Sequence, residues 1–210
     1  MTHSINSGYV EQNRNMKGHL IVIEGVDGAG KTTQAELLMK HLQSNNVPAM
    51  LVDFPQYQGF YGKIVAKYLR GEFGSIAQTS PFLIAIIYAL DRSTIRDKMT
   101  AFLEKGGIIV ANRYVPSNVA HQAANISDPA KQAEFIAWIQ ELEYTELKLP
   151  KEDTVIYLYL PWEIGMQKSE EKLKDSRHHD YLRGKFDIHE KSIAHRKATA
   201  VLFLQLLEKN

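Results

Sequence analysis

The stretch that decides the fold is HLIVIEGVDGAGKTTQ, residues 19–34. Residues 19–25 form a short apolar run that ends in glycine, which predicts a buried strand. Residues 25–32, GVDGAGKT, match the pattern G-x-x-x-x-G-K-[ST] in full, and apolar residues at helical spacing follow them. A strand, a glycine-rich loop and a helix in this order predict a site for the phosphates of a nucleoside triphosphate.

The residue types of this loop suit phosphate chemistry. Glycines let backbone N–H groups converge on phosphate oxygens, and the N-terminus of the following helix adds a positive dipole. Lys31 is expected to reach the β- and γ-phosphates, and Thr32 to hold Mg²⁺. A chance match by a glycine-rich turn is the alternative, but the strand before the loop and the helix after it argue against that. The residues predicted to bind ATP are Gly25, Gly28, Ala29, Gly30, Lys31, Thr32 and Thr33.

Outward from this loop, strand patterns alternate with helix patterns. Further strands are predicted over residues 48–55, 107–112 and 153–160. Helices are predicted over residues 31–46, 80–106, 128–147 and from about 187 to the C-terminus. Ser80 and Asp128 each precede a proline, which is typical of a helix start. The alternation predicts an α/β fold of three layers, with a mostly parallel sheet between helices and ligands beyond the carboxyl ends of the strands.

Composition narrows the class of protein. The chain has 210 residues, 44% of them hydrophobic, and a net charge of +1, which fits one domain without a general polyanion-binding surface. It has no cysteine, so disulfides and thiolate metal sites are excluded and a reducing cytoplasm is the expected location. The longest apolar run, residues 81–90, is too short for a bilayer, which needs ~20 residues. We expect neither nucleic acid nor a membrane as a partner.

The domain organisation follows from the same patterns. Residues 1–18 are polar, lack the apolar segment of a secretion signal and are predicted to be a mobile leader. Residues 19–210 are predicted to form one domain. The chain has no N-K-x-D motif for guanine, and it carries a charged segment over about 165–187 that suits a small helical lid. A small phosphate-loop domain with a lid is typical of a nucleoside monophosphate kinase.

Six motifs in order carry a specific resemblance. They are LIVIEGVDGAGKTTQ, FPQY, YLRGEFG, YALDR, NRYVPSNVAHQ and DIHE, and the resemblance covers about residues 20–208. With these motifs the chain resembles the thymidylate kinase family of P-loop nucleoside monophosphate kinases. The resemblance implies a three-layer P-loop kinase fold, transfer of the ATP γ-phosphoryl group to dTMP with Mg²⁺, and a homodimer.

The resemblance also implies roles at the start of the acceptor site. Asp27 would meet the 3′-hydroxyl of the sugar and lie near the metal, Phe54 would face the base, and Tyr57 the monophosphate. Tyr88 would stack on thymine and Arg92 would donate to a thymine carbonyl oxygen; the two are four residues apart and share a helix face. The alternatives are a core position for Phe54 and Tyr88 and a surface ion pair for Arg92.

Residues after the third predicted strand complete the acceptor site. By resemblance, Arg113 would pair with the substrate phosphate through its two-pronged guanidinium group. Ser117, Asn118 and Gln122 would complete the base pocket, with one of the two amides at the N3 edge of the pyrimidine. His121 takes a place where the family often has an aromatic residue that excludes a ribose 2′-hydroxyl.

The lid is expected to supply the catalytic cation. Some family members carry an arginine in the phosphate loop where this chain has Gly28, and members with glycine there usually use lid residues. A permanently charged fork is the best partner for a transferring phosphoryl group, so Arg177 and Arg183 are the candidates, together with Lys31 and Arg113.

Two further features of the sequence have competing interpretations. Asp187 and Glu190 either lie near the metal or form a capping box, and we favour the capping box. The neighbouring His178 and His179 lack a carboxylate framework and are expected to be exposed rather than to bind a metal.

One departure from the family concerns the metal. Many members have Asp-Arg-Tyr after the third strand, where this chain has Asn112. An asparagine can accept a hydrogen bond from a metal-bound water but adds no negative charge. Mg²⁺ is therefore expected to rest on Thr32 and the phosphates, with help from Asp27. The alternatives left open are a kinase of another substrate, such as dUMP or a deoxynucleoside, and a non-catalytic ATP-binding protein.

Overall fold

A parallel sheet forms the centre of the protein. A computed structural model describes residues 17–173 and 187–208. Within these ranges the four strands lie in the order β2-β3-β1-β4, and all neighbouring strands are parallel. The strands are β1 (His19–Gly25), β2 (Ala49–Asp53), β3 (Ile108–Asn112) and β4 (Thr154–Leu158). All four predicted strands are therefore confirmed.

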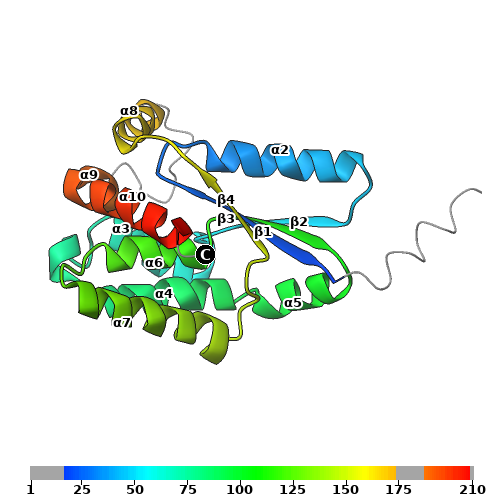
Figure 1. Ribbon diagram of the computed structural model, residues 1–210, viewed down its shortest axis with the longest axis horizontal. Coiled ribbons are helices and arrows are strands. Elements are labelled where there is room, and N and C mark those ends of the chain that lie inside the picture. The colour runs from blue at the N-terminus through cyan, green and yellow to red at the C-terminus, as the bar shows by residue number, and fades with distance from the viewer. Residues whose placement is uncertain (1–16, 174–186, 209–210) are drawn as a thin grey trace, which may run out of the picture.

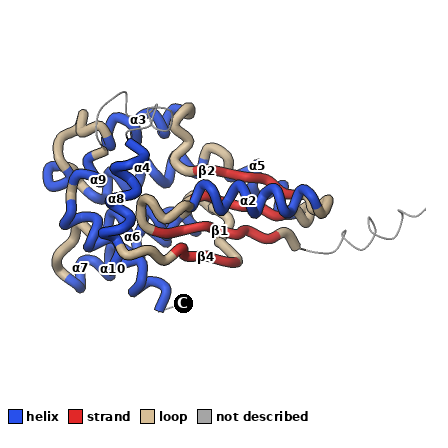
Figure 2. The backbone as a smooth tube through the Cα atoms, turned by 90° about the horizontal axis from the view of Figure 1, so that it is seen from above, coloured by secondary structure: helices blue, strands red, loops and turns tan. Residues whose placement is uncertain are grey.

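Helices cover both faces of the sheet, as the three-layer prediction requires. Figure 1 shows α2 (Lys31–Ser44) above the sheet. The helices below it in Figure 1 are α4 (Pro81–Ser93), α5 (Arg96–Glu104), α6 (Val115–Ala123) and α7 (Pro129–Gln140). Figure 2 shows further helices gathered toward the carboxyl ends of the strands, namely α3 (Phe60–Leu69), α8 (Trp162–Leu173), α9 (Ile188–Lys191) and α10 (Ile193–Glu208).

The core explains why the strands are apolar on both faces. Along β1, Leu20 and Val22 pack into the main core against the helices below the sheet, whereas Ile23 packs with Ala35 of α2 on the other side. Successive strand residues point to opposite faces, so a strand covered by helices on both sides needs apolar residues throughout. This burial places the polar loops at the carboxyl ends of the strands, beyond the core.

The single helix predicted over residues 80–106 is wrong. It is broken into α4 and α5 after Ser93. The hydroxyl of Ser93 donates to the Leu90 carbonyl at 2.8 Å, and that of Thr94 donates to the Asp91 carbonyl at 2.7 Å. Such hydroxyls compete with the backbone N–H groups that would continue the helix. The Gln56 side chain also donates to the Asp91 carbonyl, at 3.1 Å, and stabilises the break.

The predicted last helix is also divided. Asp187 accepts a hydrogen bond from the His189 N–H at 2.8 Å and is the N-cap of α9, as predicted. Ser192 interrupts the helix, and its hydroxyl accepts from the His195 N–H at 3.2 Å. The serine therefore acts as the cap of a new helix, α10. The side chain of Glu190, the other half of the predicted capping box, lies outside the described residues.

Helix α7 begins as predicted and ends in an unusual way. The Asp128 carboxylate accepts from the backbone N–H groups of Ala130 and Lys131, at 2.9 and 3.0 Å. A π-helical segment, η3 (Glu141–Glu146), follows α7 without a break. A π turn contains one residue more than an α turn, so it changes which side chain faces inward; π turns are frequent at functional sites. Here Glu143 is the inward side chain, with no exposed surface.

The predicted domain boundaries stay predictions. Residues 1–16 of the leader and residues 174–186 of the lid lie outside the described residues. The first part of the segment predicted to be a lid lies in α8. No helix in residues 17–173 or 187–208 is long and apolar enough to cross a membrane.

The carboxylate of Glu24 connects the central strand to α6. It is fully buried and accepts from the backbone N–H groups of Tyr114 and Ser117, at 2.9 and 3.1 Å. The Ser117 hydroxyl donates to its second oxygen at 2.6 Å. These contacts fix the turn between β3 and α6, from which several predicted site residues project.

We predict that Glu24→Ala lowers the free energy of unfolding by about 3 kcal/mol or more. Two buried N–H groups would lose their acceptor, at ~1–3 kcal/mol each. The measurement is urea unfolding followed by circular dichroism. Glu36→Ala, at an exposed position of α2, is the matched control and should change stability by less than about 0.5 kcal/mol. Equal urea midpoints for the two variants would contradict the role of Glu24.

Candidate active site

A cavity of about 250 Å³ lies at the carboxyl ends of the strands. It is where a parallel sheet flanked by helices binds ligands. All the residues predicted to bind the acceptor line it: Asp27, Phe54, Tyr57, Tyr88, Arg92, Arg113, Ser117, Asn118, His121 and Gln122. Gly28, Gly30, Lys31 and Thr32 of the phosphate loop line it as well. Gly25, Ala29 and Thr33 belong to the same loop and helix start but do not line the cavity, and Arg177 and Arg183 lie outside the described residues.

The phosphate loop has the backbone that its glycines permit. Gly30 is the N-cap of α2 and has φ +88°, a left-handed conformation that side chains rarely adopt. Open space surrounds it, so the conformation rather than crowding requires glycine there. The Lys31 ammonium group is buried and donates to the carbonyls of Gly25 and Val26, at 3.0 and 2.9 Å.

Gly28 is required for a different reason, which is the close approach of the lid helix. Its φ is +84°, and a Cβ atom there would collide with the carbonyl oxygen of Gly165 in α8. Conversely, a Cβ atom on Gly165 would lie 2.5 Å from the carbonyl oxygen of Asp27. The phosphate loop and α8 therefore pack backbone against backbone. A side chain as large as arginine does not fit at position 28 with α8 in this place.

An ion pair joins the phosphate loop to the end of β3. Arg113 Nη2 donates to Asp27 Oδ1, and Lys31 Nζ lies 3.8 Å from the same oxygen. Burial acts to raise the pKa of the Asp27 carboxyl, but the charges of Arg113 and Lys31 outweigh it and hold the pKa far below its usual value. Asp27 is therefore ionised at neutral pH and keeps both cations at the floor of the cavity.

Arg113 has a strained backbone that directs its side chain into the cavity. Its φ is +65°, in the left-handed region that non-glycine residues seldom occupy. Its Nη1 lies 3.1 Å from the Ser117 hydroxyl and 3.4 Å from His121 Nε2. Such strain persists only where the surrounding structure imposes it, and it is concentrated at functional sites.

Arg92 is held from below by Glu143. Its Nε donates to Glu143 Oε2 at 2.6 Å, its Nη2 donates to Oε1, and the two side chains are 2% and 0% exposed. The surface ion pair that was the alternative for Arg92 is therefore wrong. Among the described residues, Nη1 has no hydrogen-bond partner, and Arg92 lines the cavity.

Two buried amides present unpaired atoms. Asn118 Nδ2 donates to Glu143 Oε1 at 2.8 Å and to the Ala85 carbonyl at 3.0 Å, but its Oδ1 has no partner in the described part of the chain. Neither amide atom of Gln122 has a partner there. Buried amide groups are nearly always paired, because an unpaired one costs ~1–3 kcal/mol. Both residues line the cavity, so a ligand is the natural partner.

The aromatic residues predicted for the base also lie at the cavity. Phe54 is almost fully buried and packs in the main core, with its ring centroid 5.8 Å from that of Tyr114. It both lines the cavity and belongs to the core, so the two interpretations of Phe54 are compatible. Tyr88 is partly buried against the smaller cluster of α3 and α4, and burial raises its pKa well above the ordinary value, which keeps the hydroxyl neutral.

Oxygen atoms suited to a metal gather beside Thr32. Asn112 Nδ2 donates to Asp53 Oδ1 at 2.9 Å and to Thr32 Oγ1 at 3.2 Å, which leaves its Oδ1 buried and unpaired among the described residues. Asp53 pairs with Asn112 in the strand register. A hydroxyl, a carboxylate and an unpaired carbonyl oxygen are the ligand types that Mg²⁺ takes directly or through water. The residues present therefore fit this ion.

Sequence reasoning missed three contributors to this site. Asp53 is the last residue of β2 and lies near the end of the strand predicted over residues 48–55, so its place at the carboxyl edge of the sheet was a usable signal. Glu143, in a π turn, holds Arg92 and Asn118, and His189, in a short helix, lines the cavity. No local pattern predicts either position.

Comparisons with known proteins agree with this geometry. The family model described as thymidylate kinase matches residues 23–200. The thymidylate kinase of Mycobacterium tuberculosis is 34% identical over 151 residues, which are 71% of this chain and 70% of that protein. The thymidylate kinase of Plasmodium falciparum is 31% identical over 156 residues, 73% of this chain and 67% of that protein.

A solved structure supports the fold. A structure of thymidylate kinase from Candida albicans matches with a TM-score of 0.65 and 23% identity, over 90% of this chain and 78% of the other. Since the family model covers most of the sequence and the described residues have the expected sheet, loop and cavity, the chain belongs to the thymidylate kinase family.

Proposed function

We propose that the protein transfers the γ-phosphoryl group of ATP to dTMP, giving ADP and dTDP for the synthesis of pyrimidine deoxynucleotides. The observation that carries this proposal is the continuity of one cavity. Lys31 and Thr32 of the phosphate loop lie at one part of it, the amides of Asn118 and Gln122 at another, and Arg113 also lines it. The family match and the relatives named thymidylate kinase support dTMP as the acceptor.

The acceptor base takes the unpaired polar atoms. Gln122 and Asn118 meet the N3 edge of thymine, and Arg92 donates through Nη1 to a carbonyl oxygen while Glu143 holds its other nitrogens. Tyr88 supplies an aromatic face for stacking. A base that lacks these groups would leave buried amides unpaired, which is a strong source of selectivity.

Arg113 binds the phosphate of the acceptor, with Tyr57 beside it and Ser117 supporting the guanidinium group. Asp27, which keeps Arg113 in place, accepts from the 3′-hydroxyl of the sugar and takes part in the metal site through its other carboxylate oxygen. His121 excludes a ribose 2′-hydroxyl and so favours the deoxy sugar. Phe54 supports the base from the core side.

The donor lies on the phosphate loop, and the metal lies beside Thr32. Lys31 exchanges its contacts with loop carbonyls for the β- and γ-phosphates of ATP. Thr32, Asp53 and Asn112 would hold a hydrated Mg²⁺, which when bound neutralises charge on the transferring phosphoryl group.

The chemistry needs no covalent intermediate. An oxygen of the dTMP phosphate attacks the γ-phosphorus, and the bond from that phosphorus to the bridging oxygen of ADP breaks. Lys31 and Arg113 hold the two anions in line and offset their charge, which is the main contribution of protein groups to such transfers. Arg177 and Arg183 stay candidates for a further cation from the lid, where closure would exclude water.

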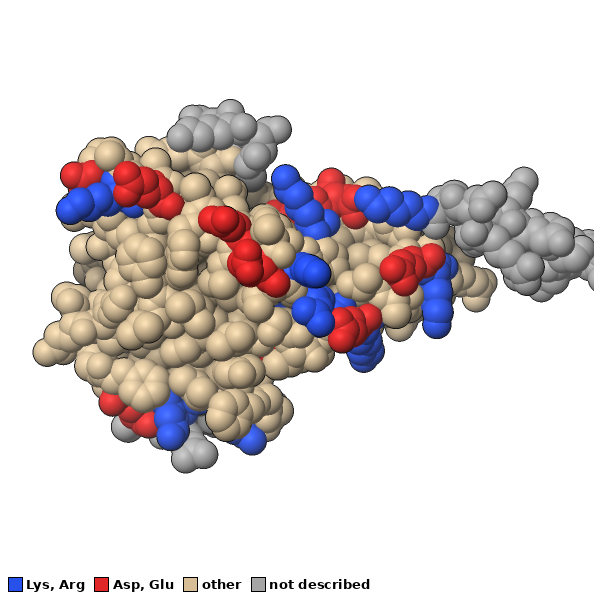
Figure 3. All heavy atoms as spheres, turned by 90° about the horizontal axis from the view of Figure 1, so that it is seen from below, with Lys and Arg blue, Asp and Glu red and all other residues tan. Residues whose placement is uncertain are grey.

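We also propose a homodimer in the cytoplasm. Leu83 and Phe82 of α4 are 62% and 45% exposed, which suits a contact with a second copy. Figure 3 shows that charged side chains are sparse on much of the face formed by the helices below the sheet in Figure 1. The location rests on the family resemblance and on the absence of cysteine from the sequence.

The first prediction for this function concerns the substrate. We expect ADP release that requires ATP, Mg²⁺ and dTMP together, measured in a coupled assay over a panel of dTMP, dUMP, UMP, dCMP and thymidine. Turnover with another acceptor and none with dTMP would overturn the assignment. ATP binding without turnover of any acceptor would identify a non-catalytic nucleotide-binding protein instead.

A second prediction separates function from stability at Gln122. We expect Gln122→Leu to raise the KM for dTMP by about 10-fold or more, because a buried ligand contact is lost. The same change should leave the free energy of unfolding equal or higher, since it removes an unpaired buried amide of similar size. Steady-state kinetics and urea unfolding provide the two measurements. A loss of stability without a change in KM would show that Gln122 is a packing residue.

A third prediction concerns Asp53 and the metal. We expect Asp53→Asn to raise the Mg²⁺ concentration for half-maximal rate by about 10-fold, since a contact to a charged oxygen is worth ~1.5 kcal/mol or more. The KM for dTMP should change little. Asp97→Asn, on the exposed side of α5, is the matched control. If both variants show the Mg²⁺ dependence of the unaltered protein, Asp53 has no part in the metal site.

A further inference from the structure

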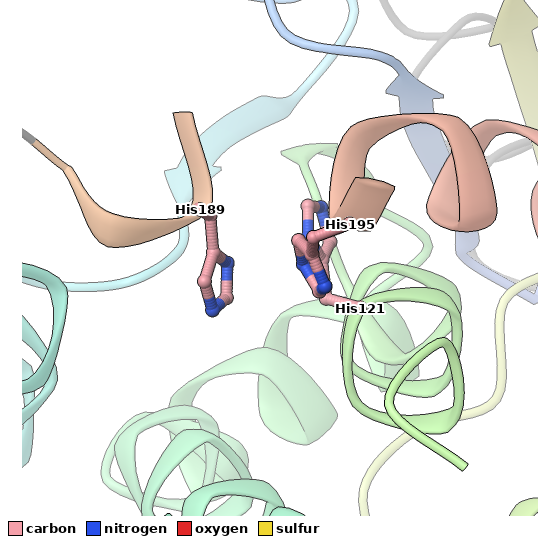
Figure 4. Close-up of side chains that lie close together, drawn as sticks. All are labelled: His121, His189 and His195. Carbon is pink, nitrogen blue, oxygen red and sulfur yellow. The ribbon is translucent and has the colours of Figure 1, made fainter. Parts of the chain in front are cut away.

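Three histidines from three helices meet beside the acceptor cavity. They are His121 of α6, His189 of α9 and His195 of α10, and one ring nitrogen of each lies within 4.8 Å of the others. Figure 4 shows the ring of His189 beside the overlapping rings of His121 and His195. The rings of His121 and His189 are stacked, with centroids 5.3 Å apart and planes 12° apart. Of these three histidines, only His121 has a proposed role in the kinase reaction. That role does not explain why the three rings lie together.

The rings have the protonation state that metal binding requires. His189 and His195 are each 5% exposed. Burial lowers the pKa of His195 to about 4, and burial together with neighbouring positive charge lowers the pKa of His121 and of His189 well below the usual value for histidine. At neutral pH the rings are therefore uncharged, and each has one nitrogen lone pair. In His121 the Nε2 atom lies 3.4 Å from the Arg113 Nη1 donor, so a ligand at Nδ1 requires the proton of His121 to move to Nε2 and this long contact to be lost.

Hydrogen bonds orient two of the rings. His195 Nδ1 lies 3.0 Å from the Asn125 carbonyl oxygen, so this nitrogen carries the proton and Nε2 carries the lone pair. His189 Nε2 lies 2.9 Å from the Tyr68 hydroxyl, which leaves Nδ1 for a ligand when Nε2 donates. Metal-binding histidines nearly always donate their other ring N–H to an oxygen in this way, since the contact fixes both tautomer and ring orientation.

The spacing suits a small ion with nitrogen ligands. His121 Nδ1 and His195 Nε2 lie 3.4 Å apart. A tetrahedral zinc ion with bonds of ~2.0–2.1 Å needs ligand atoms about 3.4 Å apart. The ligand atom of His189 lies within 4.8 Å of the other two, and its ring has to move closer and rotate out of its stack on His121 to bind the same ion. The Thr199 hydroxyl lies 3.5 Å from His195 Nε2.

A cavity with room for about one water molecule adjoins the cluster. Its volume is about 20 Å³, and its lining includes all three histidines and Asp27. A single water needs ~10–15 Å³ on this measure. Three imidazoles with a water-sized open position form the coordination pattern of an exchangeable zinc site. Arg196 also lines this cavity, and Arg113 and Lys31 lie close to Asp27. The carboxylate of Asp27 offsets part of this positive charge, which otherwise repels a cation.

We propose that His121, His189 and His195 bind one transition-metal ion that prefers imidazole, such as Zn²⁺, and that the ion fastens α9 and α10 to α6 beside the acceptor cavity. This site is distinct from the Mg²⁺ site at Thr32, because Mg²⁺ takes oxygen ligands whereas the cluster offers nitrogen. The proposal does not depend on which nucleotide the enzyme phosphorylates.

The test is metal binding by the untagged full chain without nucleotide. Zn²⁺ is titrated by calorimetry, and Co²⁺ by its visible absorption, in buffer with millimolar Mg²⁺. We expect one ion per chain. His195→Gln should weaken binding by about 100-fold or more, because loss of an orienting partner alone costs 10–100-fold. Asn125→Leu should weaken it by about 10–100-fold for that reason.

Two control variants locate the site. His41→Gln changes an exposed histidine of α2, and the double variant His178→Gln/His179→Gln changes the adjacent pair outside the described residues; both should bind as the unaltered chain does. Thermal unfolding without metal verifies that each variant is folded, and X-ray absorption of the Zn²⁺-loaded chain should indicate three imidazole ligands. Equal affinity of the unaltered chain and His195→Gln, or loss of binding only in the double variant, would overturn the proposal.

Discussion

The carboxylate of Glu24 holds the connection between the central strand and α6, and the arrangement of the cavity depends on that connection. One oxygen of this carboxylate accepts from the N–H groups of Tyr114 and Ser117 and fixes the backbone there. The Arg113 N–H donates to the Ile23 carbonyl at 3.1 Å. Arg113 is thus tied to β1 on both sides of its left-handed conformation. Strain of ~1–3 kcal/mol at one residue persists under such conditions. The guanidinium group of Arg113 then donates to the Asp27 carboxylate, and this ion pair joins the phosphate loop to the acceptor pocket.

The parts of the fold that the sequence predicts are those that local physics determines. The four strands, the phosphate loop and the Asp128 cap each follow from a few adjacent residues, and the structure contains all of them. The breaks at Thr94 and Ser192 were missed because side-chain hydroxyls there compete with the helix, and helical periodicity alone does not reveal the outcome. Local patterns set the elements, whereas these competing hydrogen bonds set their ends.

The residues of the candidate site also divide into those that the sequence predicted and those that it did not. The acceptor residues were found through the order of motifs along the chain, and the structure brings them to one cavity. The sequence did not predict the role of Glu143, because its side chain points inward as a result of a π turn and no sequence pattern indicated that turn. The histidine cluster depends on the packing of α10 against α6 and of α9 against α10, and long-range packing of this kind leaves no periodic signal.

The backbone contact between Gly28 and Gly165 has a consequence for how such enzymes can diverge. The family resemblance implies two arrangements: one has an arginine in the phosphate loop, and the other, proposed for this chain, takes its cation from the predicted lid. In this chain the backbone of α8 at Gly165 occupies the space that a side chain at position 28 needs, and the phosphate loop does the same to a side chain at position 165. An arginine at position 28 therefore requires α8 to lie elsewhere. A single mutation would create a strained, crowded loop before any compensating shift existed. An arginine in the phosphate loop of this chain therefore needs two linked changes, the substitution at position 28 and a shift of α8.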